Sequence, residues 1–260
     1  MAGRRPVLAA WYGEHGRHQL PWRRTRDRWA VLVSEVMLHQ TQAPRVEAAY
    51  AAFLVEFPTP AAMAAASAGD VIRAWGRLGY PRRARRLWDA ARRIVAEGWP
   101  EDLETLPGIG RYTAAAVAAQ VHDADVPAVE VNVRRVVERV AGRGLTVREA
   151  EAEMVRVARP LRGRDRLLAL MDVGALVCKP LAPRCPACPL QRRCATRGPL
   201  PSEERTPTSP YEGSFRQRRG EVLARLRAGP TPTALLDADA LVSLRRDGLA
   251  VVDGETARLP

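Results

Sequence analysis

The sequence predicts an all-α protein that ends in a small module of mixed structure. Apolar residues recur at helical spacing through most of the first 195 residues, where strand patterns are nearly absent. Proline, serine, threonine and glycine gather over 196–214, a composition typical of a linker. We therefore predict a helical body over 1–195, a linker over 196–214 and a small tail over 215–260.

The elements follow from the pattern in chain order. Residues 28–57 carry apolar positions at helical spacing that are broken near Pro44, so they predict two helices. The same periodicity predicts further helices in the body over 61–75, 82–96, 131–142 and 151–161. Residues 102–122 predict a short helix, a glycine turn and a second helix.

The tail contains two helical patterns followed by short apolar runs around Asp253-Gly254. This dipeptide is typical of a hairpin turn. Two helices and a hairpin resemble a reduced winged-helix module. The alternative is a small packing appendix without a ligand.

The glycine turn lies in the segment LPGIGRYTAAAVAAQ, residues 106–120. Gly108 and Gly110 stand directly before a helical pattern, and the first turn of a helix presents free N–H groups and a positive dipole end. Such a place suits an anion. A corner between two helices that serves only packing is the alternative that this stretch leaves open.

Composition indicates a polyanionic partner. The 260 residues include 41 Lys and Arg against 29 Asp and Glu, a formal net charge of +12 with an isoelectric point of about 10.7. Nucleic acid is favoured over an anionic membrane. No apolar run is long enough for a membrane span or a signal peptide, so we expect a cytoplasmic protein with no membrane partner.

All 4 cysteines of the chain fall in one short window, as Cys178, Cys185, Cys188 and Cys194. Disulfides are not expected in a cytosolic chain. Four thiolates at this spacing predict a metal centre, either a tetrahedral zinc or a [4Fe–4S] cluster. The spacing alone leaves the choice between these two open.

Several motifs together resemble the endonuclease III superfamily of DNA glycosylases. LPGIGRYT is similar to its helix–hairpin–helix, and CKPLAPRCPACPLQRRC has its iron–sulfur spacing. Four further motifs resemble the MutY adenine glycosylase branch of this superfamily: LPWR (20–23), SEVMLHQTQ (34–42), WGRLGYPRRARRL (75–87) and LMDVGALVC (170–178). The resemblance covers roughly residues 8–195.

The resemblance implies the helix–hairpin–helix glycosylase fold, with two helical subdomains and a [4Fe–4S] cluster loop over 178–194. It implies a DNA N-glycosylase of base excision repair that flips its target out of double-stranded DNA containing a mismatched or oxidised base pair. Glu35 matches the acid that protonates the departing base, and burial on an apolar helix face suits that role. Asn132 matches an orienting amide.

Tyr112 stands where bifunctional relatives have a Schiff-base lysine. Because tyrosine cannot form an imine and Lys179 is the one lysine of the chain, we expect no lysine-based lyase step.

Contacts with DNA are also implied by the resemblance. Gln40 is similar to a glutamine that enters the base stack, and Trp22 and Arg23 are similar to residues that line the base pocket. The hairpin turn is expected to give backbone N–H groups to a phosphate. The full set of DNA-binding candidates is Trp22, Arg23, His39, Gln40, Thr41, Leu106, Gly108, Gly110 and Arg111.

Three departures from the MutY pattern concern specificity. Glu130 stands where the branch has an aspartate that stabilises the developing sugar cation, Leu168 where it often has Gln or Glu, and His39 where it has the first glutamine of a pair. The tail is too short for the 8-oxoguanine-reading domain of many members. We expect a monofunctional, monomeric enzyme that removes adenine opposite 8-oxoguanine or guanine. The alternatives are a thymine or uracil mismatch glycosylase, or a lesion-binding protein weakened by Glu130.

Overall fold

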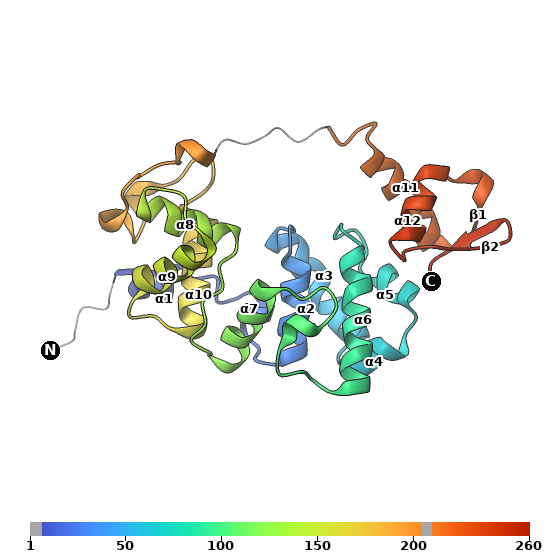
Figure 1. Cartoon of the computed structure of the whole chain (residues 1–260), viewed down its shortest axis with the longest axis horizontal. Coiled ribbons are helices and arrows are strands. Elements are labelled where there is room, and N and C mark those ends of the chain that lie inside the picture. Colours follow the sequence, from blue (N-terminus) through green and yellow to red (C-terminus); the bar gives the residue numbers. More distant parts are fainter. Residues whose placement is uncertain (1–6, 204–209) are drawn as a thin grey trace. The chain divides into compact units, whose positions relative to one another are not determined.

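The computed structural model describes residues 7–203 and 210–260, which form two compact units (Figure 1). The first unit contains the described residues up to Val31 and those from Gly110 to Glu203. The second contains Leu32–Ile109 and the described residues after the gap. The chain therefore passes between the units inside one helix and again at the glycine turn.

Helices dominate both units, as the sequence predicted. The α-helices are α1 (Val7–His15), α2 (Arg28–Leu38), α3 (Ala43–Glu56), α4 (Pro60–Ala65), α5 (Ala68–Ala74), α6 (Arg82–Glu97), α7 (Arg111–His122), α8 (Val131–Ala141), α9 (Val147–Ala158), α10 (Gly163–Asp172), α11 (Phe215–Ala228) and α12 (Ala238–Arg246). A π-helical turn (Val173–Val177) extends α10. Short 3-10 helices are Pro21–Arg23, Leu103–Thr105, Cys185–Ala187, Gln191–Arg193, Pro201–Glu203 and Thr233–Leu235, and the strands are β1 (Thr231–Pro232), β2 (Val251–Asp253) and β3 (Thr256–Arg258).

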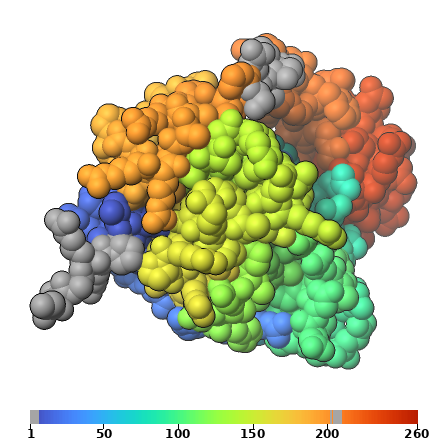
Figure 2. Space-filling model, turned by 60° about the vertical axis from the view of Figure 1, so that its left-hand side comes forward, coloured from blue at the N-terminus to red at the C-terminus, as the bar shows by residue number. Residues whose placement is uncertain are grey.

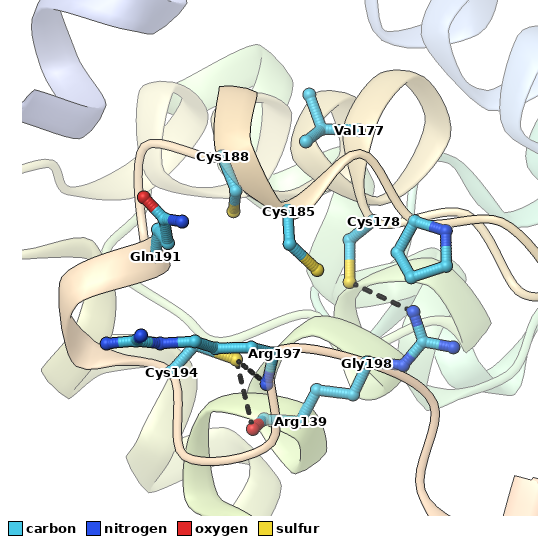
Figure 3. Close-up of a pocket in the computed structure, with 10 residues that line it drawn as sticks. Arg139, Val177, Cys178, Cys185, Cys188, Gln191, Cys194, Arg197 and Gly198 are labelled. Atoms are coloured by element: carbon cyan, nitrogen blue, oxygen red, sulfur yellow. Dashed lines mark hydrogen bonds between the residues drawn. The ribbon is translucent and has the colours of Figure 1, made fainter.

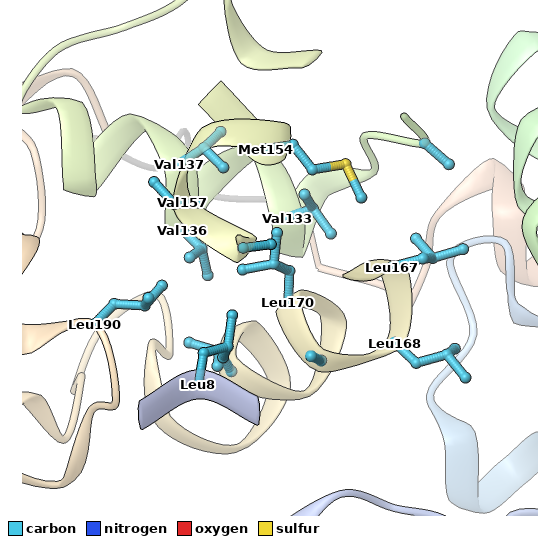
Figure 4. Close-up of a cluster of buried hydrophobic side chains, with 14 of the residues drawn as sticks. Leu8, Val133, Val136, Val137, Met154, Val157, Leu167, Leu168, Leu170 and Leu190 are labelled. Atoms are coloured by element: carbon cyan, nitrogen blue, oxygen red, sulfur yellow. The ribbon is translucent and has the colours of Figure 1, made fainter. Parts of the chain in front are cut away.

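The core of the first unit lies where α8, α9 and α10 pack together, with α1 against α10 (Figure 4). Val133, Val137 and Met154 are fully buried there. The helix ends are fixed by side chains, since Thr146 and Glu149 form a reciprocal capping box at α9. The segment that carries the cysteines, orange in Figure 2, lies against α8.

Some boundaries differ from the periodicity-based prediction. The single helix expected over 61–75 is two helices, because Ser67 accepts a hydrogen bond from the Asp70 N–H and so starts a new helix. The helical pattern expected from residue 233 is likewise divided, with Asp237 capping α12. Helices α1 and α10 were not predicted.

The tail contains α11, α12 and an antiparallel sheet with strand order β1-β3-β2. The hairpin predicted at Asp253-Gly254 is confirmed as β2–β3. The tail packs on α5 of its own unit, where the Gly69 N–H donates to the Pro260 carbonyl at 2.7 Å. Arg85 of α6 donates to the Gly248 carbonyl at 3.0 Å.

The expected linker is ordered in its first part. Leu200 is buried, and the 3-10 turn Pro201–Glu203 follows it. Residues 204–209 of that linker lie outside the described residues. The segment up to Glu203 therefore belongs to the packed structure of the first unit.

Arg83 on α6 holds the turn that follows α2. Its Nη1 donates to the carbonyls of Val36, Met37 and His39 at 2.6–2.8 Å. Its Nη2 donates to Thr41 Oγ1 at 2.9 Å and to the Gly79 carbonyl at 3.0 Å. The guanidinium also lies over the Trp75 ring, 5.2 Å from its centroid. Burial lowers the pKa of Arg83 to about 10, so the side chain stays charged at neutral pH.

We predict that Arg83→Lys lowers the free energy of unfolding by roughly 3 kcal/mol, because a lysine has fewer donors and leaves buried carbonyls without partners. Chemical denaturation measures this change. Arg92→Lys is the matched control, since Arg92 is exposed on the same helix and stacks on Trp88. If both substitutions lowered the free energy of unfolding equally, the hydrogen bonds of Arg83 to the turn after α2 would not be what stabilises the protein.

Candidate functional site

A carboxylate is fixed at the start of α8. Glu130 is the N-cap residue, and its Oε1 accepts from the Val133 N–H at 3.0 Å. Asn132 Nδ2 donates to Glu130 Oε2 at 3.0 Å. Burial raises the pKa of the Glu130 carboxyl, and the hydrogen bonds from Asn132 and Val133 oppose that rise. The arrangement holds a half-buried carboxylate in one orientation.

Arg135 orients the amide that contacts this carboxylate. Its Nη2 donates to Asn132 Oδ1 at 2.8 Å and to the Gly174 carbonyl at 2.8 Å, and its Nε donates to the Cys178 carbonyl at 2.7 Å. A Cβ on Gly174 would lie 2.7 Å from the Asn132 Cβ, so the π-helical turn can approach α8 only with glycine there. Hydrogen bonds therefore run from the cysteine segment to Glu130.

The cysteines lie together, as Figure 3 shows. Cys178, Cys185, Cys188 and Cys194 line one pocket, with Arg139 and Arg197 at its edge. Each is half-buried with a free thiol. The donor set is four thiols that face a common space, which fits a thiolate-bound metal centre.

Burial raises the pKa of Cys178, and it raises that of Cys188 to about 11. A metal that binds these sulfurs must therefore displace their protons. In the part of the chain that the structure describes, no group of His, Cys, Asp and Glu side chains is arranged to hold a single metal ion.

Trp22 and Arg23, expected to line a base pocket, are both buried in the first unit. Arg23 donates from both Nη atoms to Asp172, at 2.6 and 2.9 Å, and Arg17 Nε adds a bond of 2.6 Å to the same carboxylate. Burial raises the pKa of Asp172, but these arginines outweigh it and hold the pKa below its usual value. The guanidinium of Arg23 is thus engaged by an internal anion.

Glu35 lies on α2 in the second unit with 3% of its surface exposed. Its neighbours Val33, Val36 and Met37 are buried with it. The burial on an apolar face that the sequence predicted is therefore present.

The turn after α2 contains three of the expected DNA-binding residues. Gln40 is exposed and has a left-handed backbone with φ of 54°, an uncommon state for a residue other than glycine. Burial, and then the charge of Arg83, lower the pKa of the half-buried His39. Thr41 is buried, and its hydroxyl donates to the Leu78 carbonyl at 3.3 Å. Gln40 is the side chain of this turn that faces outward.

The glycine turn has two glycines with different surroundings. Gly108 has φ of 79°, and a Cβ there would lie 2.8 Å from the Arg86 Cβ. Gly110 is the N-cap of α7, with ordinary φ of −105° and open space around a built Cβ. Leu106 is buried, whereas Arg111 is exposed and contacts Glu151 at 2.7 Å. The N–H groups at the start of α7 therefore stand beside the open space at Gly110.

Two further candidates belong to the core of the first unit. Tyr112 is half-buried and packs against the α8–α10 cluster, while Leu168 is a buried member of that cluster. Leu168 therefore packs among apolar side chains where the MutY branch often has Gln or Glu.

Several positioning residues were missed by the sequence analysis. They are Arg83, Arg135, Arg139, Asp172, Gly174 and Glu203. The spacing of α8 contained a usable signal, because Arg135 and Arg139 lie four residues apart on one face of a helix otherwise rich in valine. Nothing in the sequence indicated their partners.

Comparisons with known proteins agree with this arrangement. Residues 33–160 match the HhH-GPD superfamily of base excision DNA repair proteins. The solved structure of a thermostable thymine-DNA glycosylase is similar with a TM-score of 0.65 and 26% identity, covering 74% of this chain and 93% of that one. The fold and the hairpin thus define a DNA glycosylase of the helix–hairpin–helix class.

Relatives that match over most of their length identify the family within this class of DNA glycosylases. The adenine DNA glycosylase of Mycolicibacterium smegmatis is 41% identical, over 96% of this chain and 94% of its own. That of Mycobacterium tuberculosis H37Rv is 39% identical, over 96% of this chain and 91% of its own. The chain belongs to the MutY-type adenine DNA glycosylase family.

We predict that Gly110→Asp weakens binding to every DNA duplex by about tenfold or more, because it adds a negative charge at the helix start while its Cβ meets open space. Fluorescence anisotropy against duplexes with and without a mismatch measures the loss. Gly110→Asn is the matched control, since it adds a similar volume without charge and should cost less. A loss confined to one mismatch would contradict a sequence-independent phosphate contact.

Proposed function

We propose that this protein is a monofunctional DNA glycosylase that hydrolyses the N-glycosidic bond of adenine mispaired with 8-oxoguanine or guanine. The observation that supports it best is the Glu130 carboxylate, oriented by Asn132 and the Val133 N–H in a chain of the MutY type. The choice of adenine rests on the similarity to adenine DNA glycosylases, and the choice of the opposite base rests on the resemblance to the MutY branch. Double-stranded DNA is the partner, and we expect a cytoplasmic monomer. No helix among residues 7–203 and 210–260 is long and apolar enough to span a membrane.

Glu35 is the general acid of this proposal. Loss of adenine from the sugar leaves negative charge on the base, and a proton delivered to the base stabilises the leaving group. The burial of Glu35 supports this role, because a general acid has to be shielded from bulk water and held in place at the reacting base. The same carboxylate then accepts a proton from the attacking water.

Glu130 stabilises the positive charge that develops on the sugar. Its two oxygens are held by separate donors, so the carboxylate is oriented before the charge appears. Glutamate is one methylene longer than the aspartate of the branch, and the N-cap geometry sets where its carboxylate lies. Asn132 acts by positioning this carboxylate, and Arg135 by positioning Asn132.

The cysteine pocket is the proposed site of a [4Fe–4S] cluster. Cys178, Cys185, Cys188 and Cys194 would supply its ligands. When bound, such a cluster cross-links the segment that carries its ligands and adds redox chemistry. The neighbouring arginines would place positive charge beside it, which suits a DNA-facing loop.

DNA contacts are proposed for the two exposed turns. The hairpin from Leu106 to Arg111 would bind a phosphate through the N–H groups at the start of α7, and Gln40 would enter the base stack. Tyr112 in place of a lysine supports base release without a lyase step.

Thymine opposite guanine is a second candidate substrate. The similar solved structure is a thymine-DNA glycosylase, and Glu130 and Leu168 both depart from the adenine-specific pattern. Sequence identity nevertheless favours adenine, since it is 41% with an adenine DNA glycosylase and 26% with the thymine enzyme.

A panel of duplexes tests this function. We expect alkali-sensitive strand breaks at adenine opposite 8-oxoguanine or guanine, and none at thymine opposite guanine. Glu35→Gln should lower the rate of base release by at least about a hundredfold because it removes the proton donor, while duplex binding is retained. Glu47→Gln on the exposed surface of α3 is the matched control. Cleavage at T·G alone would replace adenine with thymine as the substrate.

The pH dependence tests Glu130. Burial raises its pKa, so the ionised form is lost at a higher pH than for an exposed glutamate, which titrates near about 4.3. We expect the single-turnover rate to fall as pH decreases through a midpoint above that value, and Glu130→Gln to abolish this acidic limb together with most of the activity. A wild-type rate that stays constant to about pH 4.3 in folded protein would exclude the carboxylate from the reaction.

A further inference from the structure

Arg139 is a buried arginine whose hydrogen-bond capacity is fully used. It lies on α8 with 1% of its surface exposed. A guanidinium has five N–H donors. The acceptors are Glu203 Oε1 at 2.7 Å from Nε, Glu203 Oε2 and the Pro180 carbonyl from Nη2, and the Lys179 carbonyl and Cys178 Sγ from Nη1 at 2.9 and 3.4 Å. Each donor therefore has one acceptor.

Glu203 supplies the negative charge for this buried cation. It contacts Arg139 with both oxygens, an arrangement that fixes the plane of the guanidinium. Glu203 is itself held, because its backbone N–H donates to the Leu200 carbonyl at 3.0 Å and Leu200 is buried. The turn Pro201–Glu203 thus acts as a strap across the end of α8.

The same residue anchors the other end of the cysteine segment. The Arg139 carbonyl accepts from Thr196 Oγ1 at 3.0 Å, and the Ala195 N–H donates to the Val140 carbonyl at 3.2 Å. A Cβ at Gly142 would lie 2.9 Å from the Ala195 Cβ, so this end of α8 approaches the segment closely. Arg139 therefore contacts both ends of the cysteine segment, Cys178 through its side chain and Thr196 through its backbone carbonyl.

We propose that Glu203 is a positioning residue for the cysteine centre: it holds the Arg139 guanidinium against the Cys178 sulfur and so sets how firmly the cluster is retained. The inference rests on the proposed [4Fe–4S] cofactor. An N–H donor from a cation stabilises negative charge on a ligand sulfur, and residues that orient such donors tune both metal affinity and potential.

Without Glu203, the guanidinium loses the acceptors of Nε and of one Nη2 hydrogen. Buried donors left without partners are costly, so the side chain turns toward water. That movement takes Nη1 away from Cys178 and from the Lys179 carbonyl. The loop over 178–180 then loses its support from α8.

The experiment compares the full-length protein with Glu203→Asp and Glu203→Gln. Aspartate keeps the charge but is one methylene too short to hold both sides of the guanidinium, whereas glutamine keeps the length and loses the charge. The matched control is Glu153→Gln, which breaks an ion pair of the same unit outside the cysteine pocket. Cluster loss is followed as the decay of absorbance at about 400 nm in air with excess iron chelator.

We expect both Glu203 variants to lose absorbance about fivefold faster or more than wild type and Glu153→Gln. Protein-film voltammetry of Glu203→Asp should give a more negative cluster potential, because the donor to Cys178 withdraws while the net charge is unchanged. Thermal unfolding of each variant identifies any loss of the whole fold.

Three results would overturn the inference. If the absorbance of both variants decays within twofold of the wild-type rate, Glu203 has no role in retaining the cluster. If Glu203→Asp alone keeps the wild-type decay rate and cluster potential, the charge of residue 203 matters but its positioning of Arg139 does not. A colourless wild-type protein would overturn the proposed cofactor, and with it this inference. The first two outcomes leave the glycosylase proposal intact.

Discussion

Burying a guanidinium is costly unless most of its N–H groups find acceptors, and the acceptors of two arginines organise α8. Its arginines obtain their acceptors from the backbone of the cysteine segment, at Gly174, Cys178, Lys179 and Pro180. Those carbonyls come from a π-helical turn and an irregular loop that have few bonds of their own. The arginines of α8 therefore need the carbonyls of the loop as acceptors, and the loop needs the arginines as donors. Through Arg135 and Asn132, the same hydrogen bonds also orient the Glu130 carboxylate at the start of α8.

The second unit uses the same principle at another place. Arg83 donates hydrogen bonds to backbone carbonyls at and just beyond the C-terminal end of α2. These bonds support the turn in which Gln40 has a left-handed backbone conformation. The Arg83 guanidinium thereby holds the backbone of the turn from which the exposed Gln40 side chain projects. In both units, arginine supports irregular backbone from inside the protein rather than covering the surface.

The sequence predicted what local patterns determine. Helical periodicity identified most of the body, Asp253-Gly254 identified the hairpin, and the apolar neighbours of Glu35 indicated its burial. The partners of charged residues were not predictable, because Arg139 and Glu203 are separated by 64 positions and composition assigns Glu203 to a linker. The helix predicted over 82–96 gave no sign that Arg83 would be engaged by the carbonyls of Val36, Met37 and His39. Periodicity shows which face of a helix is apolar, but it gives no information on which distant acceptor a polar side chain meets.

The ion pair between Arg23 and Asp172 has a consequence for synthesis of the chain. The two residues are 149 positions apart. At the usual speed of translation, roughly 5–20 residues per second, about 7 to 30 s pass between the synthesis of Arg23 and that of Asp172. During that interval the Arg23 guanidinium lacks the carboxylate that it binds in the folded unit. The first unit can therefore complete its packing only after α10 has been synthesised, and a chain that ends before α10 lacks the helix against which α1 packs.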